Sequence, residues 1–330
     1  MNAGDKVRLG LLGAARIAPA ALIRPARKIS ETCVLAIAAR NPDRARVFAR
    51  RHGVPRVHES YENLIQDPEL DAVYIPLPNS LHCEWSIRAL RAGKHVLCEK
   101  PMASNADEAQ QMATVAAETG RVLAEAFHYR YHPLASRLKA IVDSGEIGKV
   151  RHMEAHFCVP LILPGDIRYR YELAGGATMD LGCYTINLLR YLAGAEPLVL
   201  EAHARPSSPQ VDRYMRAELE FPDGCTGRFV CSLFSIVLLR TRAVVRGTEG
   251  ELRVVGPFHP QLYNRITVRR GGAVRRERVP GEATFSYQLQ AFVDAIKGRR
   301  PMATNPEDAI ANMRVIDAVY ERAGLKRRGT

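Results

Sequence analysis

A short stretch near the N-terminus has the spacing of a phosphate-binding turn. Residues 10–18 read GLLGAARIA, so that Gly13, Ala15 and Ala18 take the three positions of the pattern G-x-G-x-x-G/A. In this pattern the first residue allows a tight turn, the second lets a pyrophosphate approach the backbone, and the third lets the helix pack closely on the strand. The free N–H groups at the start of the following helix would bind the phosphates. The residues predicted to contact the ligand in this turn are Gly10, Gly13, Ala14, Ala15, Arg16 and Ile17.

Only the first of the three positions is glycine, so the pattern by itself also fits a strand-to-helix turn that binds nothing. Its place in the first βαβ unit of the chain favours a nicotinamide dinucleotide. An NAD site usually has an acidic residue at the end of the second strand, but this chain has Ala39 and Arg40 there, with Arg44 one helical turn later. Arg40 can pair with a 2′-phosphate. We therefore expect NADP(H), with NAD(H) as the second choice; the alternative for Arg40 is an ordinary surface arginine.

Two kinds of element order follow this turn. Up to residue 126, short apolar runs at 7–12, 33–38, 72–77, 96–98 and 122–124 alternate with helical segments, which predicts a doubly wound parallel sheet of the Rossmann type. From residue 127 onward, strand-like runs follow one another with few helices, which predicts an α+β domain with an open, mostly antiparallel sheet. The predicted fold is thus α/β, with a dinucleotide-binding domain at 1–126 and an α+β domain at 127–330, to which the family resemblance described below assigns substrate binding and oligomerisation.

Charge and cysteine content exclude several kinds of protein. The chain of 330 residues has a formal net charge of +12 and seven cysteines without zinc spacing, so we expect no metal site and reduced thiols that fill the core. We see neither a signal peptide nor a membrane-spanning stretch, and we expect a cytoplasmic protein with no membrane partner. The positive charge is mostly arginine and is spread along the chain. We interpret it as a solvated surface and expect no nucleic-acid partner; the alternatives are nucleic-acid binding and attraction of an anionic ligand.

Three further segments carry a family resemblance. They are residues 76–82 (PLPNSLH), 93–101 (GKHVLCEKP) and 175–184 (GGATMDLGCY). Together with the phosphate turn, and in this order, they resemble the glucose–fructose oxidoreductase/inositol dehydrogenase (Gfo/Idh/MocA-type) family. Residues 125–133 and 165–169 are most similar to the branch that includes dihydrodiol dehydrogenase, xylose dehydrogenase and antibiotic-sugar ketoreductases. The resemblance implies an NAD(P)-dependent dehydrogenase or reductase that transfers hydride between nicotinamide and a carbinol or carbonyl carbon of a sugar, polyol or related cyclic alcohol.

The resemblance also implies roles for individual residues. Lys100 and Tyr184 match the catalytic positions, with Tyr184 as the proton donor or acceptor and Lys100 polarising the substrate oxygen and lowering the pKa of the tyrosine. Asp180 is expected to bind substrate or orient the acid/base, although it is also placed to cap the helix. The remaining cofactor contacts expected are Pro76, Leu77, Asn79, His82, Glu99, Lys100 and Arg130, and the substrate contacts are Lys100, His128, Arg168, Asp180 and Tyr184.

Some alternatives stay open. His82 can be structural as readily as binding, Arg130 can be a surface arginine, and Glu99 can fix the loop or contact the cofactor ribose. The family also leads us to expect a homodimer or homotetramer formed through the C-terminal sheet. A catalytically silent dinucleotide-binding sensor or scaffold of the same fold is the alternative function.

Overall fold

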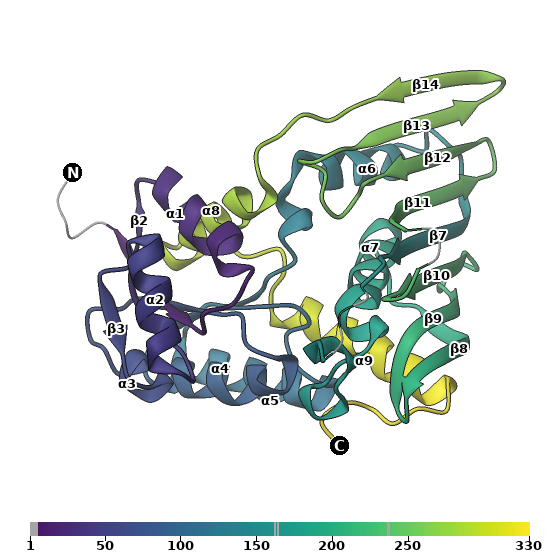
Figure 1. Ribbon diagram of the computed structural model, residues 1–330. Coiled ribbons are helices and arrows are strands. Elements are labelled where there is room, and N and C mark those ends of the chain that lie inside the picture. The colour runs from purple at the N-terminus through teal and green to yellow at the C-terminus, as the bar shows by residue number, and fades with distance from the viewer. Residues whose placement is uncertain (1–5, 162, 164, 236–237) are drawn as a thin grey trace. The chain divides into compact units, whose positions relative to one another are not determined.

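The computed structural model describes residues 6–161, 163, 165–235 and 238–330, which form two compact units (Figure 1). Unit 1 comprises the chain up to Ala103, then Asp107–His128 and Phe285–Ile310. Unit 2 comprises Ser104–Ala106, Tyr129–Thr284 and Ala311–Thr330. The compact units differ from the division predicted at 126/127 in three respects. The boundary lies at 128/129, the short segment Ser104–Ala106 belongs to unit 2, and the late segment Phe285–Ile310 packs with unit 1.

The late segment is tied to unit 1 by ion pairs and hydrogen bonds. Lys297 donates to the carboxylate of Glu31 over 2.7 Å, and Arg299 pairs with the same carboxylate. Thr304 donates its hydroxyl proton to the backbone oxygen of Glu125 over 2.6 Å. These contacts join residues more than 170 positions apart, which is why the linear pattern of strands and helices does not reveal them.

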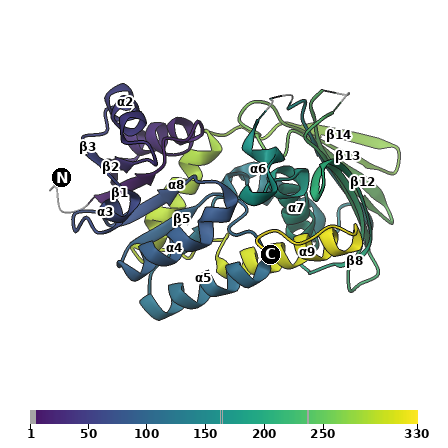
Figure 2. The ribbon, with the colours of Figure 1, turned by 60° about the horizontal axis from the view of Figure 1, so that its bottom comes forward.

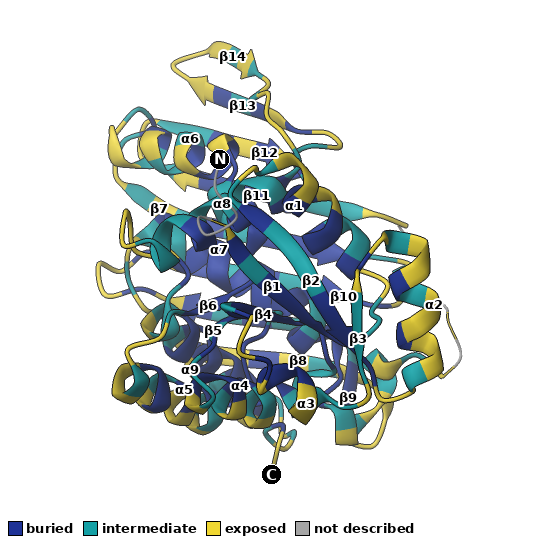
Figure 3. Ribbon diagram, turned by 90° about the vertical axis from the view of Figure 1, so that its left-hand side faces the viewer, coloured by how far each residue is buried: buried dark blue, intermediate teal, exposed yellow. Residues whose placement is uncertain are grey.

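Unit 1 is built on a six-stranded parallel sheet, as predicted. The strand order is β3-β2-β1-β4-β5-β6. The first three strands are added toward one side of the sheet and the last three toward the other, so the order reverses between β1 and β4. Strands β1 and β4 are buried, whereas the outward side of α2 is exposed (Figure 3). The strands are β1 (Val7–Leu12), β2 (Thr32–Ala38), β3 (Arg56–His58), β4 (Ala72–Ile75), β5 (His95–Cys98) and β6 (Leu123–Glu125). The helices are a π-helix at Pro19–Ile23, α1 (Arg24–Lys28), α2 (Pro42–His52), α3 (Tyr61–Ile65), α4 (His82–Arg91), α5 (Ala106–Thr119) and α8 (Thr284–Ile296).

Unit 2 is built on an eight-stranded sheet in the order β14-β13-β12-β11-β7-β10-β9-β8. Neighbouring strands are antiparallel except for β7 and β10, which confirms a mostly antiparallel sheet. Helix α7 packs on β7 and β10, and the opposite face of the sheet carries no described helix (Figure 2). The strands are β7 (Val150–Cys158), β8 (Leu198–Ser208), β9 (Val211–Glu220), β10 (Thr226–Ser232), β11 (Arg240–Gly247), β12 (Gly250–Val255), β13 (Arg265–Arg270) and β14 (Ala273–Glu277). The helices are α6 (Pro133–Asp143), α7 (Cys183–Ala193) and α9 (Pro306–Arg322), and a π-helix at Thr178–Gly182 runs directly into α7.

The cysteines lie mostly in the interior of the two units. All seven cysteines are free thiols, and five of them are buried. None of the described helices is both long and apolar enough to cross a membrane.

A buried ion pair anchors the start of the Thr178–Gly182 helix in unit 2. Asp212 and Arg328 are both fully buried and lie 3.0 Å apart. The second carboxylate oxygen of Asp212 accepts from the backbone N–H and the hydroxyl of Thr178, each over 2.7 Å, and Tyr320 donates to the first over 2.9 Å. Arg328 also donates to the backbone oxygen of Gly175 over 2.7 Å. Since every atom of the pair has a partner, the desolvation cost of the two charges is offset by hydrogen bonds.

We expect the replacement of Asp212 by alanine to lower the free energy of unfolding by about 3–5 kcal/mol, because Arg328 would then stay buried without a counter-charge. The milder Tyr320→Phe removes one hydrogen bond and should cost about 1 kcal/mol. Urea denaturation followed by circular dichroism measures both. Glu321→Gln, at an exposed position of α9, is the matched control. Losses no larger than that of the control would show that the pair does not hold unit 2 together.

Candidate active site

The predicted phosphate turn follows β1, at the edge of the sheet where the strand order reverses. Open α/β sheets bind their ligands at this point, outside the carboxyl ends of the strands. Gly13 has φ of +106° and donates its N–H to the backbone oxygen of Ala38 over 2.7 Å. This positive φ favours glycine, and a Cβ at Gly13 would also lie only 3.0 Å from Leu77 Cδ2, so the space beside the residue is tight. Ala18, at the third position of the pattern, is fully buried, which fits a small residue between helix and strand.

One residue assigned to the turn has a different part. Gly10 lies inside β1, and a Cβ there would come within 2.8 Å of the side chains of Leu64 and Leu70. The residue is therefore glycine because the helix α3 packs directly on the strand. This packing accounts for the glycine, and the contact of Gly10 with the cofactor stays a prediction.

The backbone of the turn fits a phosphate ligand. The N–H groups of residues 14–17 donate to no acceptor in the described part of the chain, and Arg16 and Ile17 are exposed. Four adjacent donors ahead of a helix are the arrangement that binds a pyrophosphate. Alanine at position 15 has an ordinary negative φ, so the replacement of the second glycine costs no backbone strain. The residues present thus fit a dinucleotide.

The end of β2 is basic, as the sequence indicates. Arg40 is exposed, and its N–H donates to the hydroxyl of Tyr61 over 3.2 Å. Asn41 caps α2 by accepting from the N–H of Arg44 over 3.1 Å. The cap keeps Arg40 and Arg44 at the N-terminal end of α2, close in sequence to Ala39. Asp43, the acid between the two arginines, pairs with Arg46 over 2.8 Å.

Lys100 follows β5 and therefore lies at the same sheet edge as the phosphate turn, because all six strands are parallel. Glu99 holds the loop: it accepts from the hydroxyl of Tyr74 over 2.6 Å and from the N–H of Lys100 over 3.3 Å. The peptide bond between Lys100 and Pro101 is cis. The contacts of Glu99 are thus those of a residue that fixes the loop.

His82 joins the loops that follow β4 and β5. Its Nδ1 lies 2.9 Å from the backbone oxygen of Pro101, and its Nε2 lies 2.9 Å from that of Leu77. The side chain is fully buried. Of its two open roles, these contacts support the structural one, since they join the loop that holds Leu77 to the loop that holds Pro101. Pro76, Leu77 and Asn79 lie in the loop after β4 at this sheet edge.

In unit 2, aromatic rings fix the position of Tyr184. It is the second residue of α7 and is 5% exposed. Its ring lies 5.5 Å from those of Phe157 and Phe258, and 5.9 Å from that of Tyr129, measured between centroids. Such packing on three sides leaves the ring little freedom to rotate away from one orientation.

Asp180 lies in the π-helix one turn before Tyr184, and it does not cap that helix. Instead its carboxylate accepts from Nε of Arg168 over 2.8 Å. Arg168 also donates to Asp166 over 3.1 Å, and the two carboxylates, Asp180 first, raise the pKa of the guanidinium. The predicted substrate contacts Asp180 and Arg168 are therefore brought together as an ion pair.

Arg130 and His128 lie in the segment 128–131 that follows β6. Arg130 Nη1 donates to the side-chain oxygen of Asn187 over 3.3 Å, and its guanidinium lies 4.0 Å from the ring centre of Tyr191. His128 is buried in unit 1 against the ring of Phe285, 4.2 Å away between centroids. Arg130 is thus held by α7, as is Tyr129, which donates to the same oxygen over 2.6 Å.

The structure adds several residues around Tyr184 that the sequence motifs do not include. Asn187 and Tyr191 lie three and seven residues after it, so helical periodicity alone would have placed them on the same face of α7. Phe157 and Phe258 come from distant parts of the chain, and nothing in the sequence pairs them with Tyr184.

Comparisons with known proteins establish the family. Residues 7–127 match the oxidoreductase family with an NAD-binding Rossmann fold, and residues 135–253 match the GFO/IDH/MocA C-terminal domain. The chain belongs to the Gfo/Idh/MocA oxidoreductase family. This confirms the predicted family and the class of enzyme, an NAD(P)-dependent dehydrogenase or reductase.

The relatives extend over nearly the whole chain. A D-xylose 1-dehydrogenase (NADP(+)) of Haloferax volcanii is 36% identical and covers 95% of this chain and 96% of its own. A dTDP-3,4-didehydro-2,6-dideoxy-α-D-glucose 3-reductase of Actinomadura kijaniata is 34% identical over 96% of this chain and 95% of its own. The crystal structure of a 3-ketoreductase from A. kijaniata with NADP and TDP-benzene has a TM-score of 0.90 at 32% identity, and covers 97% of this chain and 98% of its own.

His82 predicts how stability depends on pH. Burial and the charge of Lys100 lower the pKa of His82 to about 4, although its hydrogen bonds to two backbone carbonyl groups favour the cation. The unfolded chain, with a histidine pKa near 6.5, therefore binds more protons between pH 6.5 and pH 4. The contribution of His82 to the free energy of unfolding is fully present above pH 6.5 and is lost as the pH falls. Between pH 7.5 and pH 5 this loss is about 2 kcal/mol.

Urea denaturation of His82→Gln at both pH values tests this expectation. The variant should be less stable at pH 7.5, but its stability should change less between the two pH values, by about 2 kcal/mol. His203→Gln, on the exposed strand β8, should keep the pH dependence of the unchanged protein. An equal pH dependence in all three proteins would contradict a neutral, buried His82.

Proposed function

We propose that the protein is an NADP(H)-dependent oxidoreductase that acts on a carbinol or carbonyl carbon of a sugar, polyol or related cyclic alcohol. The observation that carries the proposal is the edge of the parallel sheet in unit 1. The phosphate turn after β1 and Lys100 after β5 lie at this one edge, with Arg40 at the end of β2. A dinucleotide bound there would have its phosphates on the turn, and Lys100 lies in a neighbouring loop at the same carboxyl edge of the sheet.

The proton is moved by groups of the chain itself. When bound, the nicotinamide supplies or accepts the hydride. Tyr184 donates the proton to the substrate oxygen in reduction and accepts it in oxidation. Since an unperturbed tyrosine has a pKa near 10, the phenolate needs a cation to stabilise it at neutral pH, and Lys100 takes this part.

Other residues of unit 2 support the step. The rings of Tyr129, Phe157 and Phe258 hold the Tyr184 side chain in place. Arg168 donates to the carboxylate of Asp180 over 2.8 Å and fixes its position. Asp180, one turn before Tyr184 in the chain, then accepts hydrogen bonds from substrate hydroxyls. The relatives act on, or bind, nucleotide-linked and free sugars, and the A. kijaniata reductase has been solved with a tyrosine replaced by phenylalanine and with a lysine replaced by alanine or glutamate. These relatives support a sugar as the substrate class, and a tyrosine and a lysine as the residues of the proposed mechanism.

The activity test begins with a screen of aldoses, polyols and ketosugars at 340 nm with NADP(H) and NAD(H). Tyr184→Phe should lower kcat by about 10²–10⁴-fold, which is the usual contribution of a positioned acid or base, with little change in the Kd of NADPH. Lys100→Met should lower kcat as well. Tyr263→Phe, at an exposed tyrosine of unit 2, is the control.

Two outcomes would overturn this assignment. Full turnover by Tyr184→Phe together with loss in Lys100→Met would make Lys100 the proton carrier. Tight binding of NADPH without turnover of any substrate in the screen would favour a dinucleotide-binding sensor of the same fold.

The choice of cofactor has its own test. Arg40→Ala should raise the KM for NADPH by about 10- to 100-fold, because a hydrogen bond to a charged group contributes about 1.5–3 kcal/mol. The KM for NADH should stay within a factor of two. Arg51→Ala, at an exposed arginine near the other end of α2, should leave both values unchanged. Equal effects on the two cofactors would remove Arg40 from the 2′-phosphate.

A further inference from the structure

Tyr61 is the first residue of α3, and none of the sequence motifs includes it. Ser60 caps this helix by accepting from the N–H of Asn63 over 3.0 Å, so the helix begins at Tyr61. Strand β3 ends at His58, just before this cap, and it runs parallel to β2 (Figure 3). Tyr61 therefore lies at the carboxyl edge of the unit 1 sheet, beside the end of β2 that is followed by Arg40.

The hydroxyl of Tyr61 lies between the phosphate turn and the end of β2. It accepts from the N–H of Arg40 over 3.2 Å. It is also close to Gly13, because a Cβ on that glycine would lie 3.9 Å from the hydroxyl oxygen. Gly13 in turn donates to the backbone oxygen of Ala38, the last residue of β2. The hydroxyl thus borders the two stretches of backbone that hold the phosphates and the adenosine ribose in a Rossmann fold.

The ring of Tyr61 packs against the only tryptophan of the chain, Trp85. The two rings meet edge to face, 5.0 Å apart between centroids and at 75°. The guanidinium of Arg88 lies 5.0 Å from the ring centre of Trp85. Arg88 is itself held by Glu62 over 3.0 Å and by Glu84 over 2.9 Å. A ring packed in this way keeps its hydroxyl oxygen in one place, so the tyrosine is preorganised for a ligand.

The Tyr61 hydroxyl keeps its proton and donates it to no acceptor within the described part of the chain. Burial raises the pKa of the phenol, although the N–H of Arg40 and the charges of Arg40 and Arg44 act in the opposite direction. The phenol is therefore protonated at neutral pH. A hydroxyl can accept and donate at the same time, and Arg40 uses only its accepting side. One hydrogen bond thus remains to be made, at a point where two arginine charges act.

We propose that Tyr61 determines cofactor specificity by donating its hydroxyl proton to the 2′-phosphate on the adenosine ribose of NADP(H). The inference rests on the proposed use of NADP(H) and adds a fixed, uncharged donor to the two mobile guanidinium groups of Arg40 and Arg44. A phosphate oxygen accepts hydrogen bonds and donates none when ionised, so it matches a hydroxyl whose accepting side is already used. The bond is charge-assisted, and it is therefore stronger than one to the neutral ribose hydroxyl of NAD(H).

The hydrogen bond from Arg40 gives Tyr61 a second way to act, as an anchor that only places the guanidinium of Arg40. A double-mutant cycle separates the two roles, because a residue that acts only through the Arg40 side chain has no effect once that side chain is removed. Arg40→Ala keeps the backbone N–H that the hydroxyl accepts. A direct bond from Tyr61 to the phosphate therefore persists in the Arg40→Ala background.

Isothermal titration calorimetry of the full chain with 2′,5′-ADP and with 5′-AMP tests the proposal, because these two probes differ only by the 2′-phosphate. Tyr61→Phe keeps the ring against Trp85 and should weaken the binding of 2′,5′-ADP by about tenfold or more. The affinity for 5′-AMP should stay within about a factor of two, since neutral contacts contribute little. In the Arg40→Ala background, Tyr61→Phe should weaken 2′,5′-ADP by at least about fivefold again. Tyr263→Phe, at an exposed tyrosine of unit 2, is the matched control and should bind both probes as the unchanged protein does.

The possible failures are distinguishable. No effect of Tyr61→Phe in the Arg40→Ala background would make the tyrosine an anchor of Arg40 and would overturn the inference. Equal weakening of both probes, with a shift of the emission maximum of Trp85, would make Tyr61 a packing residue and would overturn it as well. If Arg40→Ala weakens 2′,5′-ADP and Tyr61→Phe does not, only the role of Tyr61 is removed. Equal affinity of the unchanged protein for the two probes would overturn the proposed NADP(H) preference together with the inference.

Discussion

The ion pair between Asp212 and Arg328 holds three distant parts of unit 2 in one place. Neither charge reaches water, so β9, the C-terminal residues and the turn before the Thr178–Gly182 helix must all be in position before either charge is satisfied. One glycine of the turn follows from this pair, because a Cβ on Gly176 would collide with the carboxylate of Asp212. Gly175 has a different cause, since a Cβ there would lie 2.6 Å from the backbone oxygen of Arg168. The Gly-Gly pair that supports the family resemblance thus has structural causes, and the hydrogen bonds of Asp212 to Thr178 set the starting point of the helix that carries Asp180.

Much of the fold is predictable because the two units use different patterns. In unit 1 each buried parallel strand is a short apolar run, and a helix with a visible start follows, as Asn41 shows for α2. The strands that the sequence does not reveal are β3 and β14, at the edges of the two sheets. Their residues, RVH and AVRRE, are half-buried or exposed, since an edge strand is kept polar to prevent further pairing. Propensity and alternation lose their signal at such positions.

The sequence indicates which residues belong to the candidate site better than it indicates which side chains contact one another. Lys100 and Asn79 follow strand ends, where the pattern of a doubly wound sheet places ligand-binding loops. Gly10, by contrast, lies before the three positions of the turn pattern, and the packing of Leu64 and Leu70 explains why this residue is glycine. The partner of Asp180 is Arg168, which lies twelve positions earlier in the short 3₁₀-helix Ile167–Tyr169. A second 3₁₀-helix, Tyr171–Leu173, separates the two residues, and no local pattern links them. Contacts of this kind depend on the path of the loops, which single-sequence reasoning does not give.

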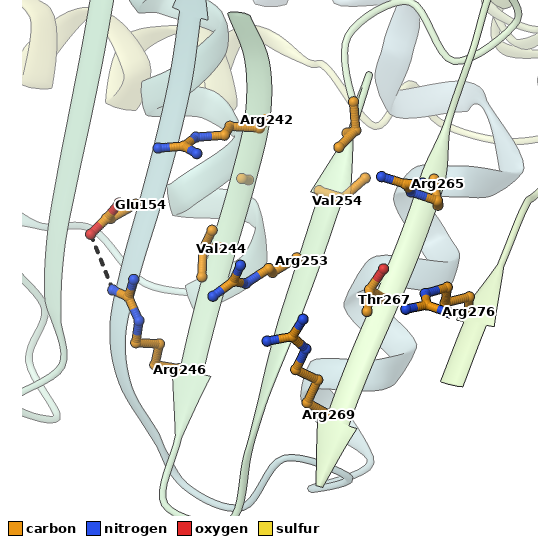
Figure 4. Close-up of a pocket in the computed structure, with 12 residues that line it drawn as sticks. Glu154, Arg242, Val244, Arg246, Arg253, Val254, Arg265, Thr267, Arg269 and Arg276 are labelled. Atoms are coloured by element: carbon orange, nitrogen blue, oxygen red, sulfur yellow. Dashed lines mark hydrogen bonds and ion pairs between the residues drawn. The ribbon is translucent and has the colours of Figure 1, made fainter. Parts of the chain in front are cut away.

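The net charge of the chain acquires a structural meaning through strand register. On β11 the apolar residues Ala243 and Val245 alternate with Arg242 and Arg246, and β12 and β13 repeat the alternation. A slip of one residue in any of these strands would turn every arginine toward the helices and every core residue toward water. The arginines therefore help to specify the register while the register, in turn, staggers them. The sequence shows the alternation within each strand, but the staggering, in which no arginine stands directly opposite another on the neighbouring strand, appears only when the pairing of Arg253 with Thr267 and Val244 is known. The positive charge, which in the sequence is spread along the chain, is thus concentrated by strand pairing on β11 to β14 of the unit 2 sheet, on the face that carries no described helix (Figure 4).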